Sequence, residues 1–296
     1  MHAAPPAWLR WAPFLFVFLW STGFIGSRLG TPFAEPLTFL SWRYLALVVV
    51  LGVFALATGA AWPRNAREAM HAAAAGLLVH GCYLGGVFCA IARGVPLATI
   101  ALLVGIQPVI TALAAGPLLG ERLTRVQWLG IALGFGGVVL VVSGKWGGPA
   151  GDAIGYASGL LALAGITAGT LYQKRHCGAI PMVTGNIVQY GAAGLVTFAI
   201  ALATETRVVQ WTPQFLFALG WLVLVLSLGA IGLLYTMIRH GEASRVSSLF
   251  FLTPPVTAVM AYFLFGERLP PVALAGLAVS AAGVALVTRG ARMEKP

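Results

Sequence analysis

The sequence predicts an all-α integral membrane protein with ten transmembrane helices, arranged as two inverted five-helix repeats. Three observations predict this fold class. The 296 residues are 59% hydrophobic and only 9% charged, with a mean hydropathy of +0.90, whereas a soluble domain carries roughly 25% charged residues. The apolar residues form ten continuous runs, and the second half of the chain repeats motifs of the first half at a constant spacing.

Each of the ten runs is long enough to cross a membrane, since the ~30 Å hydrocarbon core requires about 20 apolar residues. Continuous apolar runs favour helices over a β-barrel, in which apolar and polar residues alternate. The connections are short and predict no soluble domain, and we read the first run as an uncleaved helix. The expected spans are 11–29, 37–58, 70–92, 96–119, 126–143, 153–173, 183–204, 215–238, 244–265 and 272–288.

The distribution of lysine and arginine predicts the orientation, because these residues accumulate in cytoplasmic loops. Apart from Arg43, which lies well inside a span, twelve lie on the side of the two termini and five on the opposite side. We therefore expect a multi-pass protein of the cytoplasmic (inner) membrane with both termini in the cytoplasm. The cations are scattered singly between apolar runs, so the net charge of +10 does not indicate a nucleic-acid partner.

The repeat is most visible where GPLLGERL at 116–123 recurs as YFLFGERL at 262–269. Residues 102–142 and 248–288 share 17 of 41 positions without a gap, at an offset of 146 residues. The same offset pairs Tyr44 with Tyr190. A Gly-Glu-Arg-Leu that recurs without a gap, in register with a proline upstream, is hard to obtain by chance. The sequence therefore predicts two copies of one unit.

Five helices per copy is an odd number, so the second copy enters the membrane in the opposite orientation. We expect one repeat at residues 1–145 and an inverted repeat at residues 146–296. Inverted repeats are typical of alternating-access transporters, in which a substrate site lies near the bilayer midplane. This organisation is the strongest functional indication in the sequence.

The ten spans, the two Gly-Glu-Arg-Leu motifs and the opening FLWSTGFIGSRLGTPFAEPLTFLSWRYLAL resemble the EamA-type transporters of the drug/metabolite transporter superfamily. The resemblance covers essentially the whole chain. It implies export of small metabolites, often amino acids or their relatives, through a cavity between the two halves. The shared motifs are architectural, so the resemblance does not name a substrate.

The motif places Glu121 with Arg122, and Glu267 with Arg268, at the membrane interface. One interpretation is a gate, in which ion pairs form and break on each side as the halves move. The other is that these residues end their helices and extend to lipid headgroups. Both interpretations stay open.

Arg43 lies six residues into the second span, and its repeat mate is Gln189. A buried cation needs a partner or a water-filled cavity, and a guanidinium offers two parallel donors to a carboxylate. Arg43 is therefore either a substrate ligand or a structural residue that pairs with Glu35 or extends outward. Gln189 retains polarity without the charge.

His80 lies near the centre of the third span, with Tyr83 one turn further on. A midplane histidine is either a carrier of a coupling proton or a hydrogen-bonding helix contact. No aspartate or glutamate lies centrally in a predicted span, so carboxylate-based proton coupling is not indicated.

Prolines at the centres of spans 4 and 9 follow Gln107 and Thr253. Proline frees backbone carbonyls that must be satisfied inside a membrane, so Gln107 and Thr253 are further candidates for the cavity. Aromatic and amide side chains within spans would suit an amphipathic metabolite. They add Trp20, Tyr235 and Asn186 to the candidates.

Small residues line one face of span 5 and one face of span 10, a pattern of closely packed helices. These spans are either scaffold or the contact of a homodimer, so a monomer and a homodimer both stay open. The three cysteines suggest no disulfide, and we expect no metal and no cofactor.

We expect a secondary transporter, most naturally an exporter, of a small organic metabolite such as an amino acid. A lipid flippase and an intramembrane enzyme are the alternatives. We find no nucleophile with a base and no metal cluster, so we do not expect an enzyme. The substrate, the direction and the coupling ion are not encoded in any pattern of the sequence.

Overall fold

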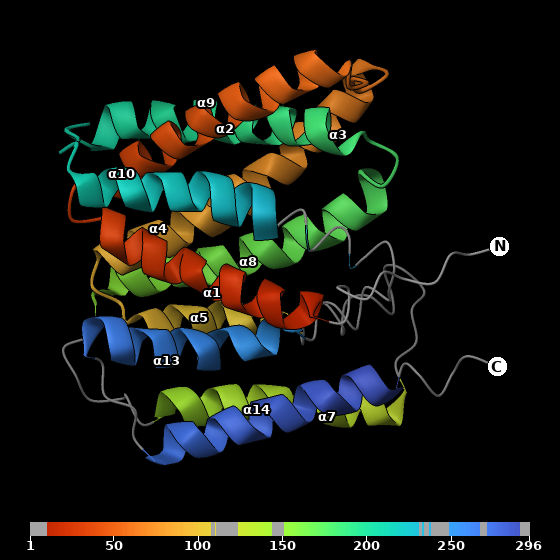
Figure 1. The fold of residues 1–296 in the computed structure, drawn as a ribbon, viewed down its shortest axis with the longest axis vertical. Coiled ribbons are helices and arrows are strands. Elements are labelled where there is room, and N and C mark those ends of the chain that lie inside the picture. Colours follow the sequence, from red (N-terminus) through yellow and green to blue (C-terminus); the bar gives the residue numbers. More distant parts are fainter. Residues whose placement is uncertain are drawn as a thin grey trace. The chain divides into compact units, whose positions relative to one another are not determined.

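The described residues fold almost entirely into helices (Figure 1). The computed structural model describes residues 11–107, 110, 124–143, 151–230, 233, 237, 249–266 and 271–290. Across these residues there is no strand, and one isolated bridge joins Ala34 to Val209. The all-α class predicted from the sequence is therefore confirmed.

Six helices in the described part of the chain are long and apolar enough to cross a membrane. One further helix is apolar but shorter. The six are Ala12–Gly30, Pro36–Thr58, Ala66–Ala92, Ala153–His176, Met182–Thr204 and Pro213–Ala230, and the shorter one is Leu249–Phe265. Two further helices, α7 (Arg125–Ser143) and α14 (Pro271–Gly290), coincide with the fifth and tenth predicted spans. Helix α5 (Leu97–Gly105) lies within the fourth predicted span, 96–119.

The helices form two compact units, and each unit takes helices from both halves of the sequence. Unit 1 comprises Met1–Ile25, Pro96–Pro149 and Leu224–Pro296, and unit 2 comprises Gly26–Val95 and Ala150–Val223. The units therefore do not coincide with the sequence repeats 1–145 and 146–296.

Seven of the described helical segments lie wholly in unit 2, and local sequence defines several of their ends. They are α2 (Pro36–Thr58), α3 (Ala66–Gly76), η2 (Leu77–Leu84), α4 (Gly85–Ala92), α8 (Ala153–His176), α9 (Met182–Thr204) and α10 (Pro213–Gly220). Asn65, Asp152 and Thr212 begin α3, α8 and α10, each accepting a backbone amide of the first turn. Gly59 ends α2 at φ 61°, a left-handed conformation that glycine adopts without strain.

The start of α8 is also joined to the end of α4 by charge. Arg93 Nη1 donates to Asp152 Oδ2 at 2.6 Å. The Gly155 amide, followed by Arg93, holds the pKa of the Asp152 carboxyl below its ordinary value. A carboxylate at a helix N-terminus is favoured by the helix dipole.

The two copies of the repeat meet in unit 2 through α2 and α9, which pack against each other. Thr38, near the start of α2, bonds to Glu205, which follows α9, at 2.7 Å. Thr184, near the start of α9, donates to the carbonyl of Ala61, beyond the end of α2, at 2.6 Å. Each helix therefore begins where the other ends, so these repeat mates run antiparallel.

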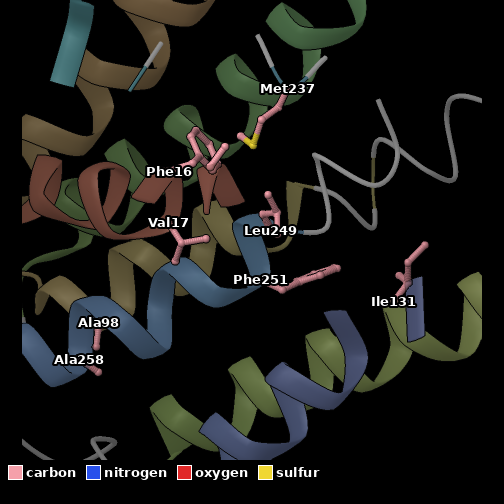
Figure 2. Packing of buried hydrophobic residues seen from close by; sticks show 9 residues of the cluster. Phe16, Val17, Ala98, Ile131, Met237, Leu249, Phe251 and Ala258 are labelled. Atoms are coloured by element: carbon pink, nitrogen blue, oxygen red, sulfur yellow. The ribbon is translucent and has the colours of Figure 1, made fainter. Parts of the chain in front are cut away.

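Unit 1 contains the first part of α1 (Ala12–Gly30), with α5, α7, α14, η4 (Leu249–Leu252) and α13 (Thr253–Phe265). Its apolar core draws on five segments and includes Phe16, Ala98, Ile131, Phe251 and Ala258 (Figure 2). Ala98 and Ala258 lie side by side where α5 packs against α13 (Figure 2). Small side chains at this contact let the two helices approach closely.

The small-residue faces of α7 and α14 pack on each other within one chain. Ser280 Oγ donates to the carbonyl of its repeat mate Gly134 at 3.3 Å. A Cβ at Gly137 would lie 2.4 Å from Ser280 N, and one at Gly283 would lie 2.4 Å from Gly134 N. The glycines predicted to serve either a scaffold or a homodimer are thus engaged in a scaffold contact.

Gly137→Ala is expected to lower the stability of the protein, because the added methyl group meets backbone atoms of α14. Overpacking of this kind costs about 1–3 kcal/mol. Gly136→Ala is the matched control, since nothing lies within 4 Å of a Cβ at Gly136. Thermal unfolding in detergent should show a lower midpoint for Gly137→Ala and an unchanged midpoint for Gly136→Ala. Equal midpoints for the two variants would contradict the close contact.

A π-helical segment occurs at the same place in each copy of the repeat. The two segments are η2 (Leu77–Leu84) and η3 (Trp221–Ala230), and the offset of 146 residues maps 77–84 onto 223–230. π-helical turns are rare and occur frequently at functional sites. The sequence indicated one continuous helix at 70–92, and the structure replaces its centre with this wider turn.

Candidate functional site

Six polar and aromatic side chains gather in the interior of unit 2, from three elements that pack together. Two come from α2, two from the π-helix η2 and two from α9. All six are buried, with Arg43 exposing 2% and His80 exposing 4% of their surfaces. We call this group the Arg43 cluster; its members are Arg43, Tyr44, His80, Tyr83, Gln189 and Tyr190.

Arg43 supplies the charge of the cluster. Its guanidinium lies within electrostatic reach of Tyr44, Tyr83 and Tyr190 and also acts on His80. The side chain is buried rather than extended toward the membrane surface, so the interpretation of an outward-pointing arginine is wrong. A cation buried in a membrane-spanning helix typically marks a substrate or ion pathway.

The predicted alternative that Glu35 pairs with Arg43 is also wrong. The Glu35 carboxylate instead accepts hydrogen bonds from Thr206 N at 2.6 Å and from Thr206 Oγ1 at 2.5 Å. Glu35 immediately precedes α2, so it lies at the helix end and faces the loop after α9.

Three rings form a stacked group beside Arg43. The His80 and Tyr190 rings stack with centroids 4.2 Å apart, and the Tyr44 and Tyr190 rings stack at 5.8 Å. The Tyr44 hydroxyl donates to the backbone carbonyl of His80 at 2.7 Å. This bond ties α2 to the π-helical turn and fixes the position of His80.

The imidazole of His80 is only partly satisfied. The Gln189 side chain interacts with the ring, whereas Nδ1 has no hydrogen-bond partner in the described part of the chain. A buried polar atom without a partner costs free energy, and it marks a place where a ligand could bind.

The cluster contains two pairs of repeat mates. Arg43 and Gln189 occupy equivalent positions of the two copies, as do Tyr44 and Tyr190. Because Tyr44 and Tyr190 stack on each other, the local twofold relation between the copies passes near their rings. The charge on Arg43 breaks this symmetry, since Gln189 carries none.

Among the other described cavity candidates, three belong to unit 1 and one lies on α9. Trp20 belongs to unit 1, where its ring packs edge-to-face against Phe250 at 5.1 Å. Gln107 and Thr253 are buried in unit 1, and Thr253 Oγ1 has no hydrogen-bond partner among the described residues. Asn186 is half-buried and donates to the carbonyl of Met182 in its own helix at 2.8 Å.

Five predicted residues lie outside the described part of the chain. They are Tyr235 and the four interface residues Glu121, Arg122, Glu267 and Arg268. Their cavity and gate roles stay predictions.

The sequence pairs Tyr44 with Tyr190 and places both within spans, but neither was named as a cavity candidate. The signal that could have identified them is their exact register in the repeat, one position after Arg43 and Gln189. The sequence analysis also missed Glu205, whose carboxylate accepts from the backbone amides of Leu37 at 2.8 Å and Thr38 at 2.7 Å. Glu205 thus satisfies the free N–H groups at the start of α2.

Glu205→Ala is expected to destabilise unit 2, because α2 loses its carboxylate cap and with it the support of Arg43 and Tyr44. Loss of such a cap costs on the order of 1–2 kcal/mol. The unfolding midpoint of Glu205→Ala in detergent should fall. The midpoint of Glu205→Gln should fall less, because glutamine keeps an acceptor oxygen. An unchanged midpoint for Glu205→Ala would show that the cap does not contribute.

Glu35 gives this junction a predictable dependence on pH. The Thr206 hydroxyl is the main cause that holds the pKa of Glu35 below its ordinary value of 4.5. Its stabilising contribution is therefore complete above that value and is lost as the pH falls through the lowered pKa. The unfolding midpoints of wild type and Glu35→Gln should differ at neutral pH and converge in acid. A difference that grows in acid would contradict the assignment.

A helical chain with several membrane-crossing helices and a charged cluster buried within them belongs to the class of polytopic membrane transport proteins. The family model of the EamA-like transporter family matches residues 7–143 and again residues 153–289. The chain therefore belongs to the EamA-like transporter family, and the resemblance seen in the sequence is confirmed.

Curated relatives cover almost the whole chain. The uncharacterized inner membrane transporter YedA of Escherichia coli (strain K12) is 28% identical over 279 residues, covering 94% of this chain and 90% of the relative. The probable terminal-alkyne amino-acid exporter of Streptantibioticus cattleyicolor is 30% identical over 291 residues, covering 94% and 93%. The probable amino-acid metabolite efflux pump of Escherichia coli (strain K12) is 23% identical and covers 95% of both chains.

One solved crystal structure shares the fold. It superposes with a TM-score of 0.75 over 98% of this chain and 100% of the other chain, at 20% sequence identity. The family match and the relatives named as transporters, rather than this fold, identify the protein as a membrane transporter of the EamA type.

Proposed function

We propose that the protein exports a small organic metabolite that carries a carboxylate, such as an amino acid, and that the Arg43 cluster binds this group. The observation that carries the proposal is the combination of a buried guanidinium with an unsatisfied His80 Nδ1 on adjacent helices. Two relatives bear names that refer to amino-acid export and amino-acid metabolite efflux. Their names support the substrate class.

The chemistry of the cluster suits a carboxylate with an apolar or aromatic remainder. Arg43 would donate in parallel to both carboxylate oxygens. In the tautomer that carries its proton on Nδ1, the Nδ1–H group would be a second donor to the substrate. The Tyr44 and Tyr190 rings would pack against the less polar part of the molecule.

The transport mechanism of the proposal is alternating access of two inverted repeats around a midplane site. The antiparallel packing of the repeat mates α2 and α9 supports it, because mates related by inversion must run in opposite directions. Further support comes from Gly134 and Ser280, which are also repeat mates in direct contact. The proposal keeps both termini in the cytoplasm, as the distribution of basic residues predicts.

The test is counterflow in liposomes that contain the purified protein. The liposomes are loaded with an unlabelled amino acid, and uptake of the labelled amino acid from outside is measured across a panel of amino acids. The proposal predicts saturable uptake of at least one carboxylate-bearing substrate and none of its carboxamide analogue. Uptake repeated with and without a pH gradient would show whether a proton is coupled. Equal uptake of the acid and the carboxamide would contradict the carboxylate assignment, and absence of uptake across the panel would contradict the amino-acid class.

A further inference from the structure

A second cluster of titratable side chains lies at one end of unit 2, where the start of α3 meets the end of α8. The His71 and His176 rings stack face to face, with centroids 4.7 Å apart and an interplanar angle of 9°. Tyr172 holds this arrangement, because its hydroxyl lies 2.8 Å from His71 Nδ1 and its ring lies 4.7 Å from that of His176.

Two arginines place positive charge next to the stacked histidines. Arg67 on α3 and Arg175 on α8 both act electrostatically on His176, and neither forms an ion pair within the described ranges. Lys174 is adjacent and exposed. The nearby acidic residue, Glu68, instead accepts the backbone amide of Arg64 at 2.8 Å. The cluster is therefore a concentration of positive charge at the ends of two membrane-crossing helices.

The neighbouring surface is apolar, as expected where a helix enters a bilayer. Met70, adjacent to His71, exposes 64% of its surface, and Trp62 in the preceding loop exposes 54%. Tryptophan is enriched at the headgroup level of membranes. The basic residues belong to the side predicted to face the cytoplasm, where anionic lipids give the membrane a negative surface potential.

We propose that His71, His176, Arg67 and Arg175 bind the phosphate of an anionic phospholipid headgroup. Basic pockets between transmembrane helices on the cytoplasmic side suit such headgroups. The guanidinium groups match the phosphate oxygens, and the imidazole N–H groups add donors at the same place. The acyl chains of the lipid would lie along the apolar surface beside Met70. This site is separate from the Arg43 cluster and does not depend on the transported substrate.

The experiment measures binding of phosphatidylglycerol and phosphatidylcholine to the detergent-purified protein by native mass spectrometry. Wild type should bind phosphatidylglycerol more tightly than phosphatidylcholine. Each lost cation should weaken phosphatidylglycerol binding about five-fold, and Arg67→Gln with Arg175→Gln should weaken it roughly 25-fold. Phosphatidylcholine binding should not change.

Arg125→Gln is the matched control, because Arg125 is also an exposed arginine at a helix end on the predicted cytoplasmic side. It should bind phosphatidylglycerol as wild type does, and millimolar inorganic phosphate should not displace the lipid. Wild-type binding by the double variant, or an equal loss in Arg125→Gln, would overturn the proposal. Displacement by inorganic phosphate would also overturn it, by assigning the site to free phosphate.

Discussion

Replacing Arg43 with glutamine is expected to abolish measurable counterflow of a carboxylate-bearing substrate in proteoliposomes. Arg43 is the one cation of the buried cluster, and its removal takes away the charge that would bind the carboxylate. Loss of one member of a buried, hydrogen-bonded charge pair costs 2–5 kcal/mol or more, so the ratio of maximal rate to KM should fall roughly 100-fold or more.

Two further variants separate the role of Arg43 in binding from a role in folding. Arg43→Lys keeps the charge but not the two parallel donors, so it should retain a small part of the activity with a raised KM. Arg93→Gln removes an exposed arginine from the same unit and should transport as wild type. If Arg43→Gln elutes as a folded protein and transports normally, Arg43 does not bind the substrate.

The second large effect is expected at His80, where the two ring nitrogens have different roles. Asparagine places a donor near the position of Nδ1, whereas glutamine places one near the position of Nε2. Because Nδ1 is the nitrogen without a partner, His80→Asn should keep most of the activity. His80→Gln has no donor at the position of Nδ1, so KM for the substrate should rise. A hydrogen bond to a charged group contributes 1.5–3 kcal/mol, which predicts a rise of roughly 10- to 100-fold.

His80→Leu removes both ring nitrogens and completes the comparison. It should transport no better than His80→Gln, because neither side chain places a donor at the position of Nδ1. The reverse ranking, with His80→Gln active and His80→Asn inactive, would show that the Gln189 contact matters and that Nδ1 does not face the substrate.

The sequence predicted the helices well because hydropathy reports directly on membrane burial. The predicted span 183–204 corresponds to Met182–Thr204, and 37–58 corresponds to Pro36–Thr58. The offset of 146 residues also predicted which helices are equivalent. The π-helical turn at Leu77–Leu84 was not predicted, because its leucine, valine and glycine residues are equally compatible with a regular α-helix.

The site was predicted only in part. Arg43, His80, Tyr83 and Gln189 were identified because polar groups inside apolar runs stand out. Their association, and the stacking of Tyr44 on Tyr190, depends on the packing of α2, η2 and α9, which hydropathy does not encode.

The incorrect expectation that Glu35 pairs with Arg43 has a similar cause. Sequence proximity placed the two residues near each other, whereas the end of α2 directs the Glu35 carboxylate to Thr206. The role of Glu205 was missed because its partners at Leu37 and Thr38 are 168 and 167 residues away in the sequence.

The central claim is that the two repeats build one carboxylate site around the mates Arg43 and Gln189, and exchanging the two residues tests it most directly. The measurement is counterflow of the carboxylate-bearing substrate by Arg43→Gln, Gln189→Arg and the double variant, reconstituted at equal amounts. The account predicts that Arg43→Gln is inactive and that the double variant recovers saturable uptake, because the guanidinium returns to the cluster from the equivalent position. A folded double variant that is as inactive as Arg43→Gln, or a folded Arg43→Gln with wild-type uptake, would contradict the account.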